Sequence, residues 1–226
     1  MDKIKRNRMV WTVFLFILSI SSVAAVELDS LNRDPEYVAS IKMRSEKIVD
    51  GLNLSDRNVR SEVTRIIANR YFELNDIYTA RDTAIDAAKS KLTGEAKEAA
   101  IQAARDKADA ALYRSHFAFP AALSLFLNDR QIEGVKDGMT YNVLHVTYSA
   151  QLDMIPTLKE EEKAQIYAWL VEAREYAMDA ESSKKKHEAF GKYKGRINNY
   201  LSKRGYNLTK EREEWAKRVK ARGGTL

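Results

Sequence analysis

"LSDRNVRSEVTRIIANRYFELNDIYTARDTAIDAAKSKLTG", residues 54–94, carries a helical pattern along almost its whole length. Its apolar side chains recur every three or four positions, which is the spacing of one face of an α-helix. The apolar positions are Val59, Val63, Ile66, Ile67, Leu74, Ile77 and Tyr78. Because no glycine or proline interrupts the run before Gly94, we predict one long helix with Ser55 as its N-cap.

The segment that follows, residues 95–119, is rich in alanine and charged residues and poor in bulky apolar ones. Alanine has the highest helix propensity, but it offers little surface to bury. We therefore predict that residues 56–112 form an exposed helical hairpin that projects from the body of the protein. Pro120 is expected to break or kink the second helix of this hairpin.

The rest of the chain is also typical of helices. Asp34 and Pro35 favour a helix start, and Gly51 favours a helix end. Residues 140–156 contain β-branched side chains that suit a strand, but their apolar spacing fits a helix better. No β-hairpin signature and no internal repeat is present. The predicted fold class is all-α: a single helical bundle with a long N-terminal helical hairpin arm, in one domain over residues 26–226.

Residues 1–25 have the organisation of a secretory signal peptide. Four basic residues lie within the first eight, an apolar run follows, and small residues stand before the expected cleavage point after Ala25. The alternative is a membrane anchor, since 18 apolar residues approach the minimum for a transmembrane helix. No cysteine follows the run, which excludes a bacterial lipoprotein. We therefore expect a periplasmic protein without stable membrane insertion after cleavage.

Charge is unevenly distributed along the chain. Residues 184–226 hold 14 Lys and Arg against 4 Asp and Glu, whereas the preceding part of the mature chain is net acidic. A basic end on an acidic body can bind an anionic ligand, or it can pair with the carboxylates of that body. Nucleic acid is not expected as a partner of an exported protein.

"HEAFGKYKGRINNY", residues 187–200, has a helical rhythm although it holds two glycines. Each interior glycine costs a helix about 1 kcal/mol relative to alanine. On a helical wheel the segment has three faces. They are a core stripe (Phe190, Ile197, Leu201), a polar face (Lys192, Arg196, Asn199, Lys203) and a line with little bulk (His187, Gly191, Gly195, Asn198). The last line favours either close packing of a second helix or a ligand groove.

Few residues indicate a reaction. Tyr141, His145 and Tyr148 would share one face of a helix, and a histidine between tyrosines can do acid–base chemistry. A lone histidine is more often a hydrogen-bonded structural residue. The catalytic candidates are therefore only Tyr141, His145 and His187. The three histidines of the chain are too widely separated for a metal motif, so neither a metal nor a cofactor is predicted.

Several long strings of the sequence resemble the bacterial family catalogued as domain of unknown function 3826. They include "VKDGMTYNVLHVTYSAQLDMIPTL", "AWLVEAREYAMDAESSKKKHEAFGKYKGRINNYLSKRGY" and "EEWAKR". "ASIKMRSEKIVDGLNLSD" and "IIANRYFELNDIYTARD" are similar to the N-terminal part of the family. The resemblance covers residues 35–220 and implies an exported helical protein of a Bacteroidetes polysaccharide-utilisation system. No catalytic residue of the family is carried over to this chain.

The resemblance further implies that the partner is an oligosaccharide or polysaccharide, bound by an accessory protein. Sugar sites combine aromatic platforms with hydrogen-bonding side chains, and the basic residues near 184–204 favour an acidic sugar such as a uronate. The candidate ligand-binding residues are Trp169, Arg174, His187, Tyr193, Lys194 and Asn198. One alternative is a polysaccharide lyase acting on a uronate-containing glycan, and another is a structural interaction protein. The question of enzymatic activity is left open.

Overall fold

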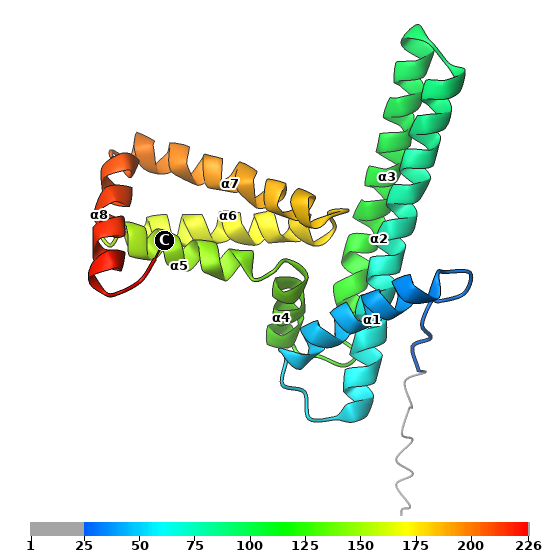
Figure 1. The fold of residues 1–226 in the computed structure, drawn as a ribbon, viewed down its shortest axis with the longest axis horizontal. Coiled ribbons are helices and arrows are strands. Elements are labelled where there is room, and N and C mark those ends of the chain that lie inside the picture. The colour runs from blue at the N-terminus through cyan, green and yellow to red at the C-terminus, as the bar shows by residue number, and fades with distance from the viewer. Residues whose placement is uncertain (1–24, 226) are drawn as a thin grey trace, which may run out of the picture.

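The computed structural model describes residues 25–225, and this range contains eight α-helices and no strand (Figure 1). The helices are α1 (Pro35–Asp50), α2 (Arg57–Lys91), α3 (Gly94–Leu123), α4 (Asp129–Met139), α5 (Val143–Met154), α6 (Glu160–Met178), α7 (Ser183–Lys203) and α8 (Leu208–Ala221). The all-α prediction is confirmed. The predicted signal segment lies outside the described residues except for Ala25. Among the helices of residues 25–225, none has an apolar stretch long enough to cross a membrane.

α2 and α3 form the hairpin that the sequence predicts, and Figure 1 shows them running side by side away from the other helices. Only two residues connect them, and Gly94 takes a left-handed backbone conformation (φ 58°) at the reversal. The side chains buried between the two helices include Ala88, Ala104 and Ala108. Small side chains let two helices approach closely, which explains why an alanine-rich segment makes this arm.

At the ends of these helices, the predicted N-cap Ser55 is wrong, and of the break or kink expected at Pro120 the break is absent. The N-cap of α2 is Asp56 rather than Ser55, because its carboxylate accepts hydrogen bonds from the backbone N–H groups of Asn58 and Val59. Pro120 does not end α3, which continues to Leu123. A proline near a helix end removes a single hydrogen bond. The complete burial of Leu123 in the core offsets that loss.

The helices form two lobes with separate hydrophobic cores. The hairpin lobe consists of α1 to α4, and its core includes Val49, Ile67 and Val135. The C-terminal lobe consists of α5 to α8, with α5, α6 and α7 side by side and α8 across their far end (Figure 1). Met178, the last residue of α6, packs into the core of the hairpin lobe. The two lobes therefore meet at the C-terminal end of α6.

Lys186 joins the lobes at this meeting point. It is buried, and its Nζ donates hydrogen bonds to the backbone oxygens of Met139, at the end of α4, and Met178, at the end of α6. The C-terminus of a helix carries partial negative charge, so a cation between two such ends is favourable. Burial nevertheless lowers the pKa of Lys186 to about 8.

The two glycines of α7 are not packed against another helix. A Cβ atom built on Gly191 or on Gly195 would meet no other atom within 4 Å. The interpretation as a close-packing surface is therefore wrong. The predicted core stripe is a separate face of α7, and its residues Phe190, Ile197 and Leu201 are buried.

Candidate functional site

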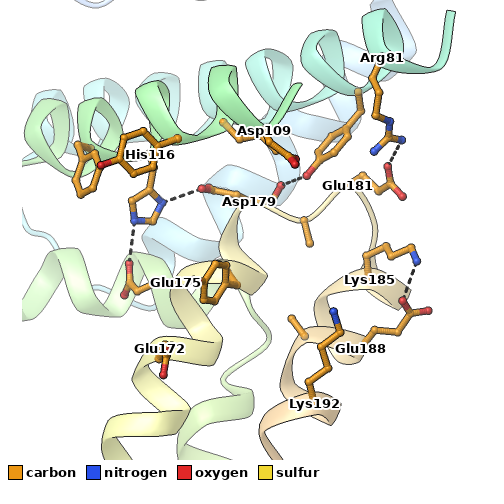
Figure 2. A pocket seen from close by; sticks show the side chains of 17 residues that line it. Arg81, Asp109, His116, Glu172, Glu175, Asp179, Glu181, Lys185, Glu188 and Lys192 are labelled. Carbon is orange, nitrogen blue, oxygen red and sulfur yellow. Dashed lines mark hydrogen bonds and ion pairs between the residues drawn. The ribbon is translucent and has the colours of Figure 1, made fainter. Parts of the chain in front are cut away.

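An open cleft of about 970 Å³ lies between the two lobes. Figure 2 shows its walls: α2 and α3 supply one side, and the C-terminal half of α6 with the first turns of α7 supplies the other. We call it the interlobe cleft. Its volume lies at the upper end of the range of small-molecule sites. It has room for a ligand larger than a single small metabolite.

Exposed aromatic side chains line the interlobe cleft. Tyr113 and Phe117 of α3 are 71% and 60% exposed, and Tyr176 of α6, on the opposite wall, is 65% exposed. Tyr113 meets Phe117 edge to face at a centroid distance of 5.5 Å, and Tyr176 stacks on Tyr193 at 6.5 Å. Large apolar surface exposed around one cavity is typical of binding sites. These rings can pack against the apolar face of a ligand.

A histidine held between two carboxylates lies at the side of the cleft (Figure 2). The His116 Nδ1 lies 2.8 Å from Asp179 Oδ2, and its Nε2 lies 3.7 Å from Glu175 Oε2. The other oxygen of Asp179 accepts a hydrogen bond of 2.7 Å from Arg70, whose side chain is buried. Asp179 therefore orients the imidazole, and the Nε2 side of the ring faces Glu175.

The hydrogen bonds of Asp179 also connect the lobes. Arg70 belongs to α2 and His116 to α3, whereas Asp179 is the C-cap residue of α6. The Tyr78 hydroxyl donates to the backbone oxygen of Asp179 at 2.7 Å, and burial raises the pKa of Tyr78 to about 12. Tyr78 thus stays a protonated donor at neutral pH. The position of the hairpin relative to α6 depends on these bonds.

Acidic side chains outnumber basic ones in the lining of the cleft. Six Asp and Glu residues line it, against three Lys and Arg residues. Two of the cations are already paired, Arg81 with Glu181 at 2.5 Å and Lys185 with Glu188 at 2.8 Å (Figure 2). Three of the carboxylates are paired with cations that do not line the cleft, Asp179 with Arg70, Glu175 with Lys136 and Glu172 with Arg196. A neutral ligand with hydroxyl donors would find acceptors among these carboxylates.

Arg174, a predicted ligand-binding residue, is placed inside the protein. Its side chain is 2% exposed and donates to Asp137 at 2.7 Å and to Glu133. Burial lowers the pKa of Arg174, but the hydrogen bonds to Asp137 and Glu133 raise it above its ordinary value. The guanidinium thus links α6 to α4 and does not line the cleft.

The weak catalytic candidates also lie outside the cleft. Tyr141 precedes α5 with a left-handed backbone (φ 58°) and stacks on His187 at 5.8 Å. His145 Nε2 lies 2.9 Å from Asp137, the residue that also holds Arg174. Tyr141 is thus paired with His187 and His145 with Asp137. Tyr141 and His145 do not share one helix face, because Tyr141 lies before the start of α5.

The other predicted ligand-binding residues lie along α6 and α7. Tyr193 is half-buried and stacks on Tyr176. Its burial and, to a smaller extent, its hydrogen bond to Glu172 raise the pKa of Tyr193 to about 12. Trp169 is half-buried and borders a separate groove on α7. Lys194 is exposed and Asn198 half-buried, and neither lines the cleft or that groove. Within residues 25–225, no group of three or more His, Asp or Glu side chains could hold a metal ion.

Sequence reasoning missed the residues that the cleft brings together. Tyr113, His116 and Phe117 are spaced by three and four, so they share one face of a helix. That spacing could have marked an aromatic face around a histidine. The pairing of His116 with Asp179 had no such signal, because the two residues are 63 positions apart.

Comparison with known families gives a match that spans both lobes and the cleft. The family model described as "Protein of unknown function (DUF3826)" matches residues 38–221. A comparison with curated proteins finds no match. The matched range includes every residue that lines the interlobe cleft, so the cleft belongs to the domain that this family model describes.

Proposed function

This chain belongs to the DUF3826 family, and we propose that it binds a carbohydrate chain in the interlobe cleft. The observation that carries the proposal is the set of exposed rings on opposite walls, Tyr113 and Phe117 facing the side of Tyr176. Such rings can stack on the apolar faces of sugar rings. Carboxylates and lysines between them can accept from and donate to sugar hydroxyl groups.

The charge of the cleft refines the class of sugar. Two of the three lysine and arginine side chains that line the cleft are already paired, whereas its carboxylates can accept hydrogen bonds from sugar hydroxyl groups, so a neutral oligosaccharide fits better than a uronate. This differs from the acidic glycan that the basic C-terminal residues favoured. The reason is that many of these basic residues, such as Arg204 and Arg222, are paired elsewhere with Glu161 and Asp153.

Export belongs to the same proposal. The organisation of residues 1–25 supports an accessory protein of polysaccharide utilisation that works in the periplasm after signal cleavage. Mass spectrometry of the native protein is expected to give an N-terminus near residue 26. An intact Met1 in the membrane fraction would contradict this part of the proposal.

The binding test uses a panel of neutral and acidic oligosaccharides and isothermal titration calorimetry with the mature protein. Tyr176→Ala is expected to weaken binding of the best neutral ligand at least tenfold. Tyr167→Ala is the matched control, since Tyr167 is also exposed but packs on Tyr148, outside the cleft. If no oligosaccharide binds, or if Tyr176→Ala binds as well as the wild type, the proposal fails.

A second candidate function is chemistry on the bound glycan, favoured by the Asp179–His116 pair. An imidazole whose Nδ1 is held by a carboxylate can take or give a proton at Nε2. This second function requires a uronate-containing glycan in place of the neutral one: in a lyase reaction Nε2 would remove the proton beside the sugar carboxylate, and the electron pair would form a carbon–carbon double bond while the C–O bond to the leaving sugar oxygen breaks. The leaving oxygen would then take a proton.

Assays for reducing ends and for ultraviolet-absorbing unsaturated products separate the two functions. Turnover by the wild type that His116→Gln abolishes, with ligand binding retained, would make the protein an enzyme. Binding without product in either assay supports the binding protein.

A further inference from the structure

A second groove lies on the outer surface of the C-terminal lobe, along α7. It has a volume of about 590 Å³. Its wall is Trp169 of α6, and its floor is the polar face that the helical wheel of α7 predicts, namely Lys192, Arg196, Asn199 and Lys203. Gly195 lies between them and leaves the helix backbone uncovered. We call it the α7 groove.

Arg196 is held in place by an aromatic ring and by one carboxylate at the limit of hydrogen-bond distance. Its guanidinium lies 4.6 Å from the centre of the Trp169 ring, a cation–π distance. Its ion-pair partner among the described residues is Glu172, at 3.5 Å. A guanidinium stacked on an aromatic ring loses little further freedom when its N–H groups bind a carboxylate. Arg196 is therefore a prepared anion-binding group.

Two lysines extend this positive surface along the helix. Lys192 and Lys203 form no ion pair among residues 25–225, and no carboxylate lines the groove. With a rise of about 1.5 Å per residue, the face from Lys192 to Lys203 is about 16 Å long. The three cations thus form a row, which matches several negative charges spaced along a chain better than it matches one small ion.

We propose that the α7 groove binds an acidic polysaccharide, a chain of sugar units that carry carboxylates. Arg196 receives one carboxylate as a bidentate partner, and Lys192 and Lys203 receive neighbouring ones. The Asn199 amide lies on the same face and can exchange hydrogen bonds with sugar hydroxyl groups. The groove shares Lys192 with the lining of the interlobe cleft, but its other lining residues belong to a different surface, and the proposal does not depend on what the cleft binds.

The aromatic residues favour a polysaccharide over a nucleic acid. Arg196 covers one face of Trp169, and Arg204 lies 4.8 Å from the centre of the Tyr200 ring. The two rings also meet each other edge to face at 5.1 Å. Proteins that bind single-stranded nucleic acid offer open ring faces on which bases stack. The rings of this groove are engaged with arginines, so they position charge instead.

Binding of polygalacturonate to the mature protein, measured by affinity electrophoresis and calorimetry at low salt, tests the proposal. The triple variant Lys192→Ala, Arg196→Ala, Lys203→Ala is expected to weaken binding at least tenfold. A control with the same change in net charge removes Lys89, Lys91 and Lys107, which are exposed on the hairpin. This control is expected to bind within twofold of the wild type. All six positions are exposed, and circular dichroism verifies that both variants remain folded.

Further measurements test whether carboxylate recognition and the α7 groove account for the binding. Arg196→Lys keeps the charge but loses the planar fork, and it is expected to weaken binding about threefold or more. A neutral galactan should not compete with polygalacturonate for this groove, and Tyr176→Ala in the cleft should leave polygalacturonate binding unchanged. Absence of polygalacturonate binding, equal losses in the two triple variants, or tighter binding of a thymidine oligonucleotide through the same residues would each overturn the proposal.

Discussion

Replacing the glycines of α7 by alanine should stabilise the protein. Gly191 and Gly195 are interior helical residues, and an added methyl group would meet no atom within 4 Å at either position. The change therefore brings only the gain in helix propensity, about 1 kcal/mol for each glycine. Gly191→Ala together with Gly195→Ala should raise the free energy of unfolding by about 2 kcal/mol. For a protein of this size, that corresponds to an increase in Tm of about 4–8 °C.

Two glycines of α4 provide controls for this prediction. A Cβ on Gly138 would lie 2.8 Å from Cγ2 and 3.2 Å from Cγ1 of Ile48, a buried β-branched side chain. Overpacking costs about 1–3 kcal/mol, which exceeds the propensity gain, so Gly138→Ala should destabilise the protein. A Cβ on Gly134 would meet only the tip of the half-buried Leu52 side chain, at 2.8 Å. Leu52 can rotate away, and Gly134→Ala should be nearly neutral.

Urea denaturation, with a check that the m-value stays constant, measures the stability of the variants at positions 191, 195, 134 and 138. The order of stability expected is the alanine variants at 191 and 195 first, then the wild type and Gly134→Ala, and Gly138→Ala last. A loss of stability on Gly191→Ala or Gly195→Ala would refute the reasoning. It would mean that the backbone of α7 is covered by a close partner, as the packing interpretation of the sequence supposed.

Three other predictions concern a buried cation, a buried ion pair and the N-caps of two helices. The pKa of Lys186 is lowered from 10.5 to about 8 in the folded protein, so between these pH values the unfolded chain binds more protons and stability rises with pH. Urea denaturation at pH 8 and at pH 9.5 should therefore show that the wild type gains about 1.5 kcal/mol of stability relative to Lys186→Met. Equal pH slopes in the two proteins would disprove this. Arg174→Met should cost about 3 kcal/mol in urea denaturation, because it removes the buried guanidinium that pairs with the nearly buried Asp137. A loss below about 1 kcal/mol would contradict that role. Ser182→Ala should lower the free energy of unfolding by about 1 kcal/mol, since the Ser182 hydroxyl caps α7 by accepting from the Lys185 N–H. Ser55→Ala should change it little, because Asp56 is the N-cap of α2. A larger loss for Ser55→Ala than for Ser182→Ala would contradict these assignments.

The helices could be predicted from the sequence because their signals are local. The apolar spacing from Val59 to Tyr78 and the alanine-rich run that follows predict the hairpin, and the predicted start of α1 at Asp34 and Pro35 is confirmed. Errors arise where two neighbouring residues compete for one role. Ser55 and Asp56 are both good caps, and only the backbone geometry of Asp56 (φ −79°, ψ 120°) selects it. Pro120 is expected to break or kink its helix, and α3 nevertheless continues past it to Leu123, which is buried in the core.

The two candidate sites differ in how much of each the sequence could reveal, and the reason is physical. The floor of the α7 groove consists of residues on one face of one helix, so a helical wheel alone brings Lys192, Arg196 and Lys203 together. The interlobe cleft requires four helices to come together. Its central hydrogen bonds join Asp179 to Arg70 across 109 positions and to His116 across 63.

Periodicity states which face of a helix is polar or aromatic, but it does not state which faces meet. Asp179 illustrates this limit. In the sequence it is one acidic residue among many near the end of a helix, and its role comes only from the hairpin that packs against it. If the hydrogen bonds of Asp179 set the width of the cleft, Asp179→Asn should weaken the binding of a neutral oligosaccharide in the cleft while leaving polygalacturonate binding in the α7 groove unchanged. Titration of both ligands against this one variant measures the two effects separately. Equal losses at both sites would show instead that Asp179 supports the fold as a whole.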